Sequence, residues 1–167
     1  MEYEPALRRV VLFGGRDGDT GTVYGDPWFY NGSTWQQRAP ANSPSPRYRA
    51  AAATDSRRKR IVLFGGFDGT DIVNDTFEFT GDDWALMGTG VDVPSNATET
   101  YHGYDPVRSK FVIFGGFGGV FSADTWEYTG INNGLFARFG TNCTTPTTTP
   151  TVEASVPTIG QTLNFTF

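Results

Sequence analysis

One motif of six residues occurs three times in this chain and constrains its fold more than any other feature. The copies are Val10–Gly15, Ile61–Gly66 and Phe111–Gly116, and they recur about every 50 residues. Each copy begins with four β-forming residues. Such a run predicts a strand buried on both faces, because a half-exposed strand would alternate with polar residues. Repetition at this period predicts a repeat architecture.

Each copy of the motif ends in two glycines: Gly14-Gly15, Gly65-Gly66 and Gly115-Gly116. Glycine accepts φ > 0 and has no side chain, so the backbone is expected to approach a neighbouring segment closely where the strand ends. An acidic residue precedes each copy at a fixed distance: Glu4, Asp55 and Asp105. The repeated unit is therefore longer than the motif itself.

An aromatic segment follows each glycine pair after a variable loop rich in Gly and Asp. It opens with an aspartate in every copy: Asp26, Asp75 and Asp124. The two aromatic residues that follow are two positions apart, so they point to the same face of a strand. We expect the aspartate to accept backbone N–H bonds in the turn before this strand. Trp35 and Trp84 stand nine residues past the aspartate and predict a further short strand.

One period thus contains four predicted strands: a small-residue strand, the glycine-pair strand, the aspartate-aromatic strand and the tryptophan strand. Four antiparallel strands about every 50 residues describe one blade of a β-propeller. The expected blades are residues 1–40, 41–90 and 91–140, and the first is incomplete because Met1 aligns with Ala52 inside the small-residue strand. An ordinary β-sandwich with accidental similarity between segments is the alternative.

These spaced features resemble the kelch repeat. The residues that carry the resemblance in the second copy are Arg47, Ala51-Ala52, Ile61–Gly66, Asp75, Phe77–Phe79 and Trp84. The resemblance covers residues 1 to 139 and implies a kelch-type β-propeller, similar to the central domain of galactose-oxidase-like proteins. It also implies that the small-residue strand is innermost and the tryptophan strand outermost.

The third copy and the blade number depart from a complete kelch propeller. Asn133 occupies the position expected for tryptophan, and Phe136 or Phe139 would replace it after a local shift. Three blades do not close a ring, since propellers have about four to eight. We therefore expect an all-β fragment of a propeller with three four-stranded blades in residues 1–140.

The C-terminal part of the chain changes in character. Residues 141–158 begin with a stretch rich in Thr and Pro and predict an extended linker. In residues 159–167 apolar and polar residues alternate, which predicts one more strand. We interpret this strand as the first of a following, truncated β domain. In the alternative it folds back onto the propeller segment.

Composition excludes several classes of partner. The net charge is −5 at pH 7, and an acidic domain offers no electrostatic footprint for nucleic acid. No apolar run is long enough to span a membrane, and the N-terminus lacks the features of a signal peptide. The basic run Arg57–Arg60 is interpreted as a solvated turn, with an anion-binding patch as the alternative.

Groups that carry catalysis or bind cofactors are scarce. The chain has one histidine, His102, and one cysteine, Cys143. Kelch-fold copper oxidases use two histidines, which this chain cannot supply. The loops Asp17–Asp19 and Asp68–Asp71 lack the third carboxylate and the spacing of a calcium site and are interpreted as turns, with a bound cation as the alternative. We therefore expect no catalytic residue, no cofactor and no metal here.

The geometry of an up-and-down blade places one set of loops on a common rim. The glycine-pair loops and the connections between blades emerge on the same side, which becomes the expected ligand-binding rim. Its candidate residues are Arg16, Asp17, Asp19, Arg47, Tyr48, Phe67, Asp68, Asp71, Asn96 and Phe117. Aromatic residues beside Asp and Arg suit a protein or carbohydrate surface. In the alternative, Phe67 and Phe117 pack between blades.

The sequence thus favours a non-catalytic binding or scaffolding module within a larger bacterial protein, located outside the cell or on its surface. The first alternative is a fragment of a glycan-active kelch enzyme whose catalytic residues lie on missing blades. The second is a half-propeller that associates with itself through its open blade edges.

Overall fold

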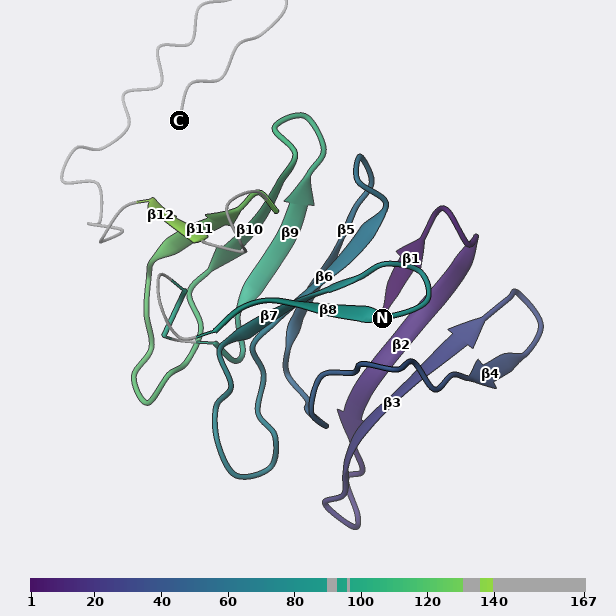
Figure 1. The fold of residues 1–167 in the computed structure, drawn as a ribbon. Helices are drawn as coiled ribbons and strands as arrows, with labels where there is room; N and C mark the ends of the chain where they lie inside the picture. The colour runs from purple at the N-terminus through teal and green to yellow at the C-terminus, as the bar shows by residue number, and fades with distance from the viewer. Residues whose placement is uncertain (90–92, 96, 131–135, 140–167) are drawn as a thin grey trace, which may run out of the picture.

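The fold is all-β, as the sequence predicts. The computed structural model describes residues 1–89, 93–95, 97–130 and 136–139 (Figure 1). Its twelve strands form three antiparallel sheets of four strands each. Within these residues no helix is long and apolar enough to cross a bilayer. The predicted linker 141–158 and the predicted strand 159–167 lie outside the described residues.

In each sheet the strands are neighbours in chain order, which is the up-and-down arrangement of a propeller blade. Sheet 1 contains β1 (Glu2–Glu4), β2 (Arg9–Arg16), β3 (Val23–Tyr30) and β4 (Trp35–Gln37). Sheet 2 contains β5 (Ala51–Asp55), β6 (Arg60–Phe64), β7 (Asp75–Phe79) and β8 (Trp84–Thr89). Sheet 3 contains β9 (Tyr101–Asp105), β10 (Lys110–Phe114), β11 (Thr125–Tyr128) and β12 (Phe136–Phe139).

The three sheets stand side by side in chain order (Figure 1). The first strands of the sheets contact one another, since β1 touches β5 and β5 touches β9. They are therefore the inner strands, and β4, β8 and β12 lie at the opposite edge of each sheet. This agrees with the predicted order, in which the small-residue strand is innermost.

The middle strand β6 is buried on both faces, as its uninterrupted apolar run predicts. Ile61 and Leu63 face sheet 1, where they join a buried cluster with Phe79 and Trp84. Val62 and Phe64 alternate with them and face sheet 3, in a second buried cluster. Each cluster is thus the packing layer between two neighbouring sheets, and β6 contributes to both.

The glycine pairs allow the close backbone approach that the sequence predicts. Gly65 and Gly66 have φ of 66° and 109°, and the N–H of Gly66 donates to the carbonyl of Ala97 at 2.7 Å. The N–H of Gly15 donates in the same way to the carbonyl of Arg47 at 2.9 Å. These two pairs therefore each hold the connection that leads into the next sheet.

Phe136 occupies the tryptophan position of sheet 3. It pairs with Tyr128 in the register in which Trp84 pairs with Phe79, and the two ring pairs have centroid distances of 5.2 and 5.0 Å. Asn133 lies outside the described residues. A local shift of three positions thus restores the outer aromatic residue of the blade.

The carboxylates of the repeated aspartates were expected to accept hydrogen bonds from backbone N–H groups. In the structure they accept hydrogen bonds from side chains instead. Asp26 accepts from the Trp28 indole at 2.6 Å, and Asp124 accepts from the Arg138 guanidinium at 2.9 Å. Asp75 accepts from Arg47. The shared position is thus an anchor for a side chain that differs from one sheet to the next.

Candidate binding groove on the loop rim

The glycine-pair loops and the inter-sheet connections lie on one rim, as predicted. Isolated β-bridges join Tyr48 to Phe67 and Thr98 to Phe117. In the first bridge the N–H of Phe67 donates to the carbonyl of Tyr48 at 2.9 Å, and the N–H of Tyr48 donates to the carbonyl of Phe67 at 3.0 Å. The same positions of two successive repeats therefore build the same loop-to-connection contact, and a groove forms between them.

The groove lies between sheets 2 and 3 and has a cavity volume of about 350 Å³. It is lined by Tyr48, Arg49, Phe67, Ile72, Thr98, Glu99, Phe117 and Phe121. We call this set of residues the rim groove. The Tyr48 and Phe67 rings meet edge to face at 5.7 Å, and the Phe117 and Phe121 rings lie 5.1 Å apart. Two aromatic pairs and Ile72 thus form its apolar lining.

An ion pair lines the rim groove together with the two aromatic pairs. Arg49 Nη1 and Glu99 Oε1 are 2.5 Å apart, although the two side chains are 55% and 40% exposed. The two residues hold equivalent positions before β5 and β9, and both have φ in the left-handed region, at 58° and 56°. Non-glycine residues held in this conformation are concentrated at functional sites. The pair offers a donor and an acceptor side by side at the surface.

The ring of Tyr48 lies close to two arginine side chains of the rim. The guanidinium groups of Arg16 and Arg49 lie 5.7 and 5.3 Å from its ring centroid, within the range of cation–π attraction. Arg16 is exposed, and Tyr48 and Phe67 are half-buried. The half-burial of Phe67 and Phe117 means that these aromatic residues both pack on neighbours and present surface to the groove.

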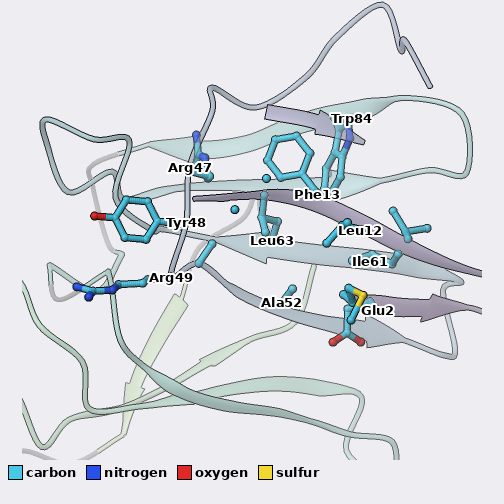
Figure 2. Close-up of a pocket in the computed structure, with 15 residues that line it drawn as sticks. Glu2, Leu12, Phe13, Arg47, Tyr48, Arg49, Ala52, Ile61, Leu63 and Trp84 are labelled. Carbon is cyan, nitrogen blue, oxygen red and sulfur yellow. The ribbon is translucent and has the colours of Figure 1, made fainter. Parts of the chain in front are cut away.

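A second hollow lies on the other side of Tyr48, between sheets 1 and 2 (Figure 2). Arg47, Tyr48 and Arg49 stand at one end of it, and Phe13 and Trp84 lie on its wall (Figure 2). Its volume is about 180 Å³, and its walls are mostly the apolar side chains that pack the two sheets together. Its polar lining groups are engaged within the chain, since Arg47 pairs with Asp75 and Glu2 accepts from the Thr54 hydroxyl at 3.0 Å, so the rim groove is the better binding site.

Arg47 does not belong to the accessible rim, which corrects its predicted place there. Its side chain is 1% exposed and forms an ion pair with Asp75. It also donates to the carbonyl of Gly65 at 3.0 Å and lies over the Phe77 ring. A guanidinium with these partners holds the connection onto sheet 2 and is not available to a ligand.

The loop aspartates form turns, as predicted. Asp17 accepts from the backbone N–H groups of Asp19 and Thr20 at 2.8 Å, and Asp68 accepts in the same way from Thr70 and Asp71. The side chains of Asp19 and Asp71 are exposed, and Asn96 lies outside the described residues. Among the residues that the structure describes, no three His, Cys, Asp or Glu side chains gather as metal ligands.

Protonation of Asp68 is expected to loosen its loop. Backbone N–H groups of Asp71 and Thr70 lower the pKa of this carboxyl below its ordinary value of 3.8. The unfolded chain then takes up the proton first, so the stabilisation is present above pH 3.8 and is lost as the pH falls through the folded value. A carboxyl titration by NMR should give a midpoint below 3.8, accompanied by shifts of the Thr70 and Asp71 amides.

The Asp68→Asn variant serves as the control for this titration. It retains an oxygen acceptor and removes the ionisable group, so the acid-dependent amide shifts in this loop should disappear. A midpoint at or above the ordinary value in the parent chain would contradict the assignment.

Sequence reasoning missed five groove residues: Arg49, Ile72, Thr98, Glu99 and Phe121. A signal for two of them was available, because Arg49 and Glu99 hold the same position of successive repeats and carry opposite charges. Phe121 gave no such signal, since it lies in a loop whose length and composition vary between repeats.

Comparison with known proteins gives one partial relative. A stretch of 127 residues is 36% identical to part of the dynein alpha chain of the flagellar outer arm from Chlamydomonas reinhardtii. The match covers 66% of this chain and 3% of the dynein chain. No family model matches the sequence. The similarity therefore relates this chain to a small part of a much longer protein.

Proposed function

We propose that this chain is a non-catalytic, kelch-type propeller module that binds a protein ligand in the rim groove. The observation that carries the proposal is the exposed Arg49–Glu99 ion pair in a groove that is also lined by two aromatic pairs. Aromatic residues and arginine are enriched at protein interfaces, and half-buried rings lose little entropy when they are covered. A peptide segment with an apolar side chain beside polar groups fits this arrangement.

A glycan is the second candidate ligand. The aromatic rings offer apolar faces to sugar C–H groups, and the ion pair offers one donor and one acceptor to sugar hydroxyls. Both candidates use the same residues, so a single set of variants tests them.

The similarity to a small part of a dynein chain supports a module that serves within a larger protein. The extracellular or cell-surface location in a bacterium stays a prediction. The same holds for the alternative of a glycan-active enzyme with its catalytic residues on further blades. A turnover assay on glycans would test the latter.

Screening a peptide phage library and a glycan array with this chain should give binders that depend on Phe121. Its ring is 78% exposed, so Phe121→Ala should leave the fold intact and weaken binding about tenfold or more by removing one aromatic wall. The matched control is Val107→Ala, an exposed apolar residue of the β9–β10 turn on the opposite side of the sheets.

The double exchange Arg49→Glu with Glu99→Arg sharpens this test. It keeps an ion pair of similar geometry and reverses its direction, so folding should persist while the choice of ligand changes. The proposed function fails if neither library yields a binder, or if binders are indifferent to Phe121→Ala and to the exchange.

A further inference from the structure

The interface between sheets 2 and 3 contains a buried polar network. Arg58 of sheet 2 pairs with Asp55 at 2.6 Å and with Glu78 at 2.7 Å. Two tyrosines of sheet 3 complete it, since Tyr128 donates to Glu78 at 2.6 Å and Tyr104 donates to Asp55 at 2.5 Å. One sheet therefore supplies an acid–arginine–acid set, and the sheet that follows supplies two phenols.

A glycine provides the space for the arginine of this network. A Cβ built on Gly130 would lie 2.0 Å from Cζ of Arg58, so a side chain there would displace the guanidinium from its place beside Asp55 and Glu78. Gly32 holds the corresponding position in sheet 1, with φ of 101°, and a Cβ on it would meet no atom within 4 Å. The space beside Gly32 in sheet 1, which corresponds to the space that Arg58 fills beside Gly130, is therefore unoccupied.

The interface between sheets 1 and 2 has apolar residues at two of the three positions and keeps an acid at the other, where the buried Glu4 corresponds to Asp55. Leu7 replaces the arginine, and Phe29 replaces the second acid. Phe29 packs edge to face on Phe79, which stands at the position of Tyr128, with centroids 5.7 Å apart. The chain thus contains two chemically distinct kinds of junction between sheets.

The open face of sheet 3 repeats the acid–arginine–acid set. Arg108 pairs with Asp105 at 2.7 Å and with Glu127 at 2.5 Å, in the geometry of the network in sheet 2. The apolar residues around the set are also repeated, because Val112 and Phe114 hold the positions of Val62 and Phe64. Phe114 is 38% exposed, whereas Phe64 is fully buried. The face has the composition of a junction of the polar kind.

The open face of sheet 1 carries the complementary set. Tyr3 and Tyr30 occupy the positions that Tyr104 and Tyr128 occupy in sheet 3. Tyr3 and Tyr30 both pair with Val10 of β2, just as Tyr104 and Tyr128 both pair with Phe111 of β10. Tyr3 is 53% exposed. The aromatic residues at the neighbouring positions also correspond, with Trp28 at the position of Trp126 and Trp35 at that of Phe136.

We propose that sheet 1 of one copy docks on sheet 3 of a second copy. In this arrangement Tyr30 and Tyr3 donate to Glu127 and Asp105 of the other chain, and Arg108 enters the space at Gly32. The Tyr30 hydroxyl, which donates to its own Gly32 carbonyl at 2.9 Å in the single chain, changes partner. Two such junctions related by a two-fold axis close a ring of six blades, within the usual range of about four to eight.

A second copy is the occupant favoured by these residues. Two junctions of the polar kind require an acid–arginine–acid face and a face with two tyrosines, and the chain presents one of each. Sheet 2 cannot serve as the occupant, because both of its faces are already covered by sheets 1 and 3. The two open faces are also apolar around the polar set, so pairing removes exposed aromatic surface from water.

Sedimentation velocity of the whole chain tests the proposal. Between 1 and 100 micromolar, about the range where weak dimers assemble, the mass should approach twice the chain mass of 18.3 kDa. The double variant Tyr3→Phe with Tyr30→Phe removes only two hydroxyls per chain and should raise the dimer dissociation constant about tenfold or more. Glu127→Gln should act in the same direction from the opposite face.

Phe121→Ala is the matched control, because it alters the rim groove and neither open face. It should leave the mass unchanged while it weakens ligand binding, so the two proposals can fail separately. Circular dichroism confirms that each variant is folded. A chain that stays monomeric over this range overturns the proposal, as does a dimer whose affinity is unaffected by the tyrosine pair and by Glu127→Gln.

Discussion

Replacing Gly65 with alanine is expected to lower the free energy of unfolding by about 3 kcal/mol or more. A Cβ at this position would lie 2.0 Å from the carbonyl oxygen of Ala97 and 2.8 Å from its Cβ. The carbonyl oxygen belongs to the backbone and the Cβ is fixed to it, so no side-chain rotation relieves the overlap. The φ of 66° adds the strain of a left-handed conformation. Urea unfolding followed by circular dichroism measures the loss.

Gly119→Ala is the control for the backbone strain alone. Its φ is 97°, and a Cβ there would meet no atom within 4 Å. We expect it to cost only about 1–2 kcal/mol, from the positive φ. If the two variants lost equal stability, the close approach between the glycine pair and the connection at Ala97 would not be what constrains Gly65.

Replacing Arg58 with leucine is expected to cost about 3 kcal/mol, since it leaves two buried carboxylates without their cation. The side chains of Asp55 and Glu78 are 3% and 6% exposed, so water does not replace the lost partner. Tyr128 still donates to Glu78, but a neutral hydroxyl does not offset a buried charge. The measurement is again the free energy of unfolding in urea.

The repaired variant adds Glu78→Phe and Tyr128→Phe to Arg58→Leu. These three changes copy the junction between sheets 1 and 2, where Leu7, Phe29 and Phe79 pack together. Well-packed apolar residues often stabilise a protein as much as a buried ion pair does, or more. The triple variant should therefore regain most of the free energy of unfolding that Arg58→Leu loses. A triple variant that is no more stable than Arg58→Leu would contradict the equivalence of the two junctions.

The order of the strands and the burial of β6 were predictable from the sequence. The apolar run Ile61–Phe64 has no polar position, so only a strand covered on both faces accommodates it. The glycine pair that follows predicted a close approach, and the positive φ of Gly65 and its contact with Ala97 confirm it. These features depend on local chemistry that repeats three times, which makes them readable without a structure.

The partners of charged residues were not predictable in the same way. Arg47 was expected on the accessible rim because it lies in a connection between blades, yet it is buried against Asp75. The two residues are 28 positions apart, and nothing in either segment specifies that they meet. For a similar reason the sequence did not indicate that Asp124 would anchor the guanidinium of Arg138, which follows it by 14 positions.

The sequence by itself thus determined the repeat, the four strands of each blade and the shared rim of the loops. Periodicity is sufficient for this, because the alternation of buried positions and the glycine turns act over a few residues. Tertiary structure alone decided which residues face one another across the sheets. It placed Arg49 beside Glu99 in the rim groove, and it made one junction polar and the other apolar. Such contacts join residues about 50 positions apart, where a single sequence contains no record of which side chain lies opposite which.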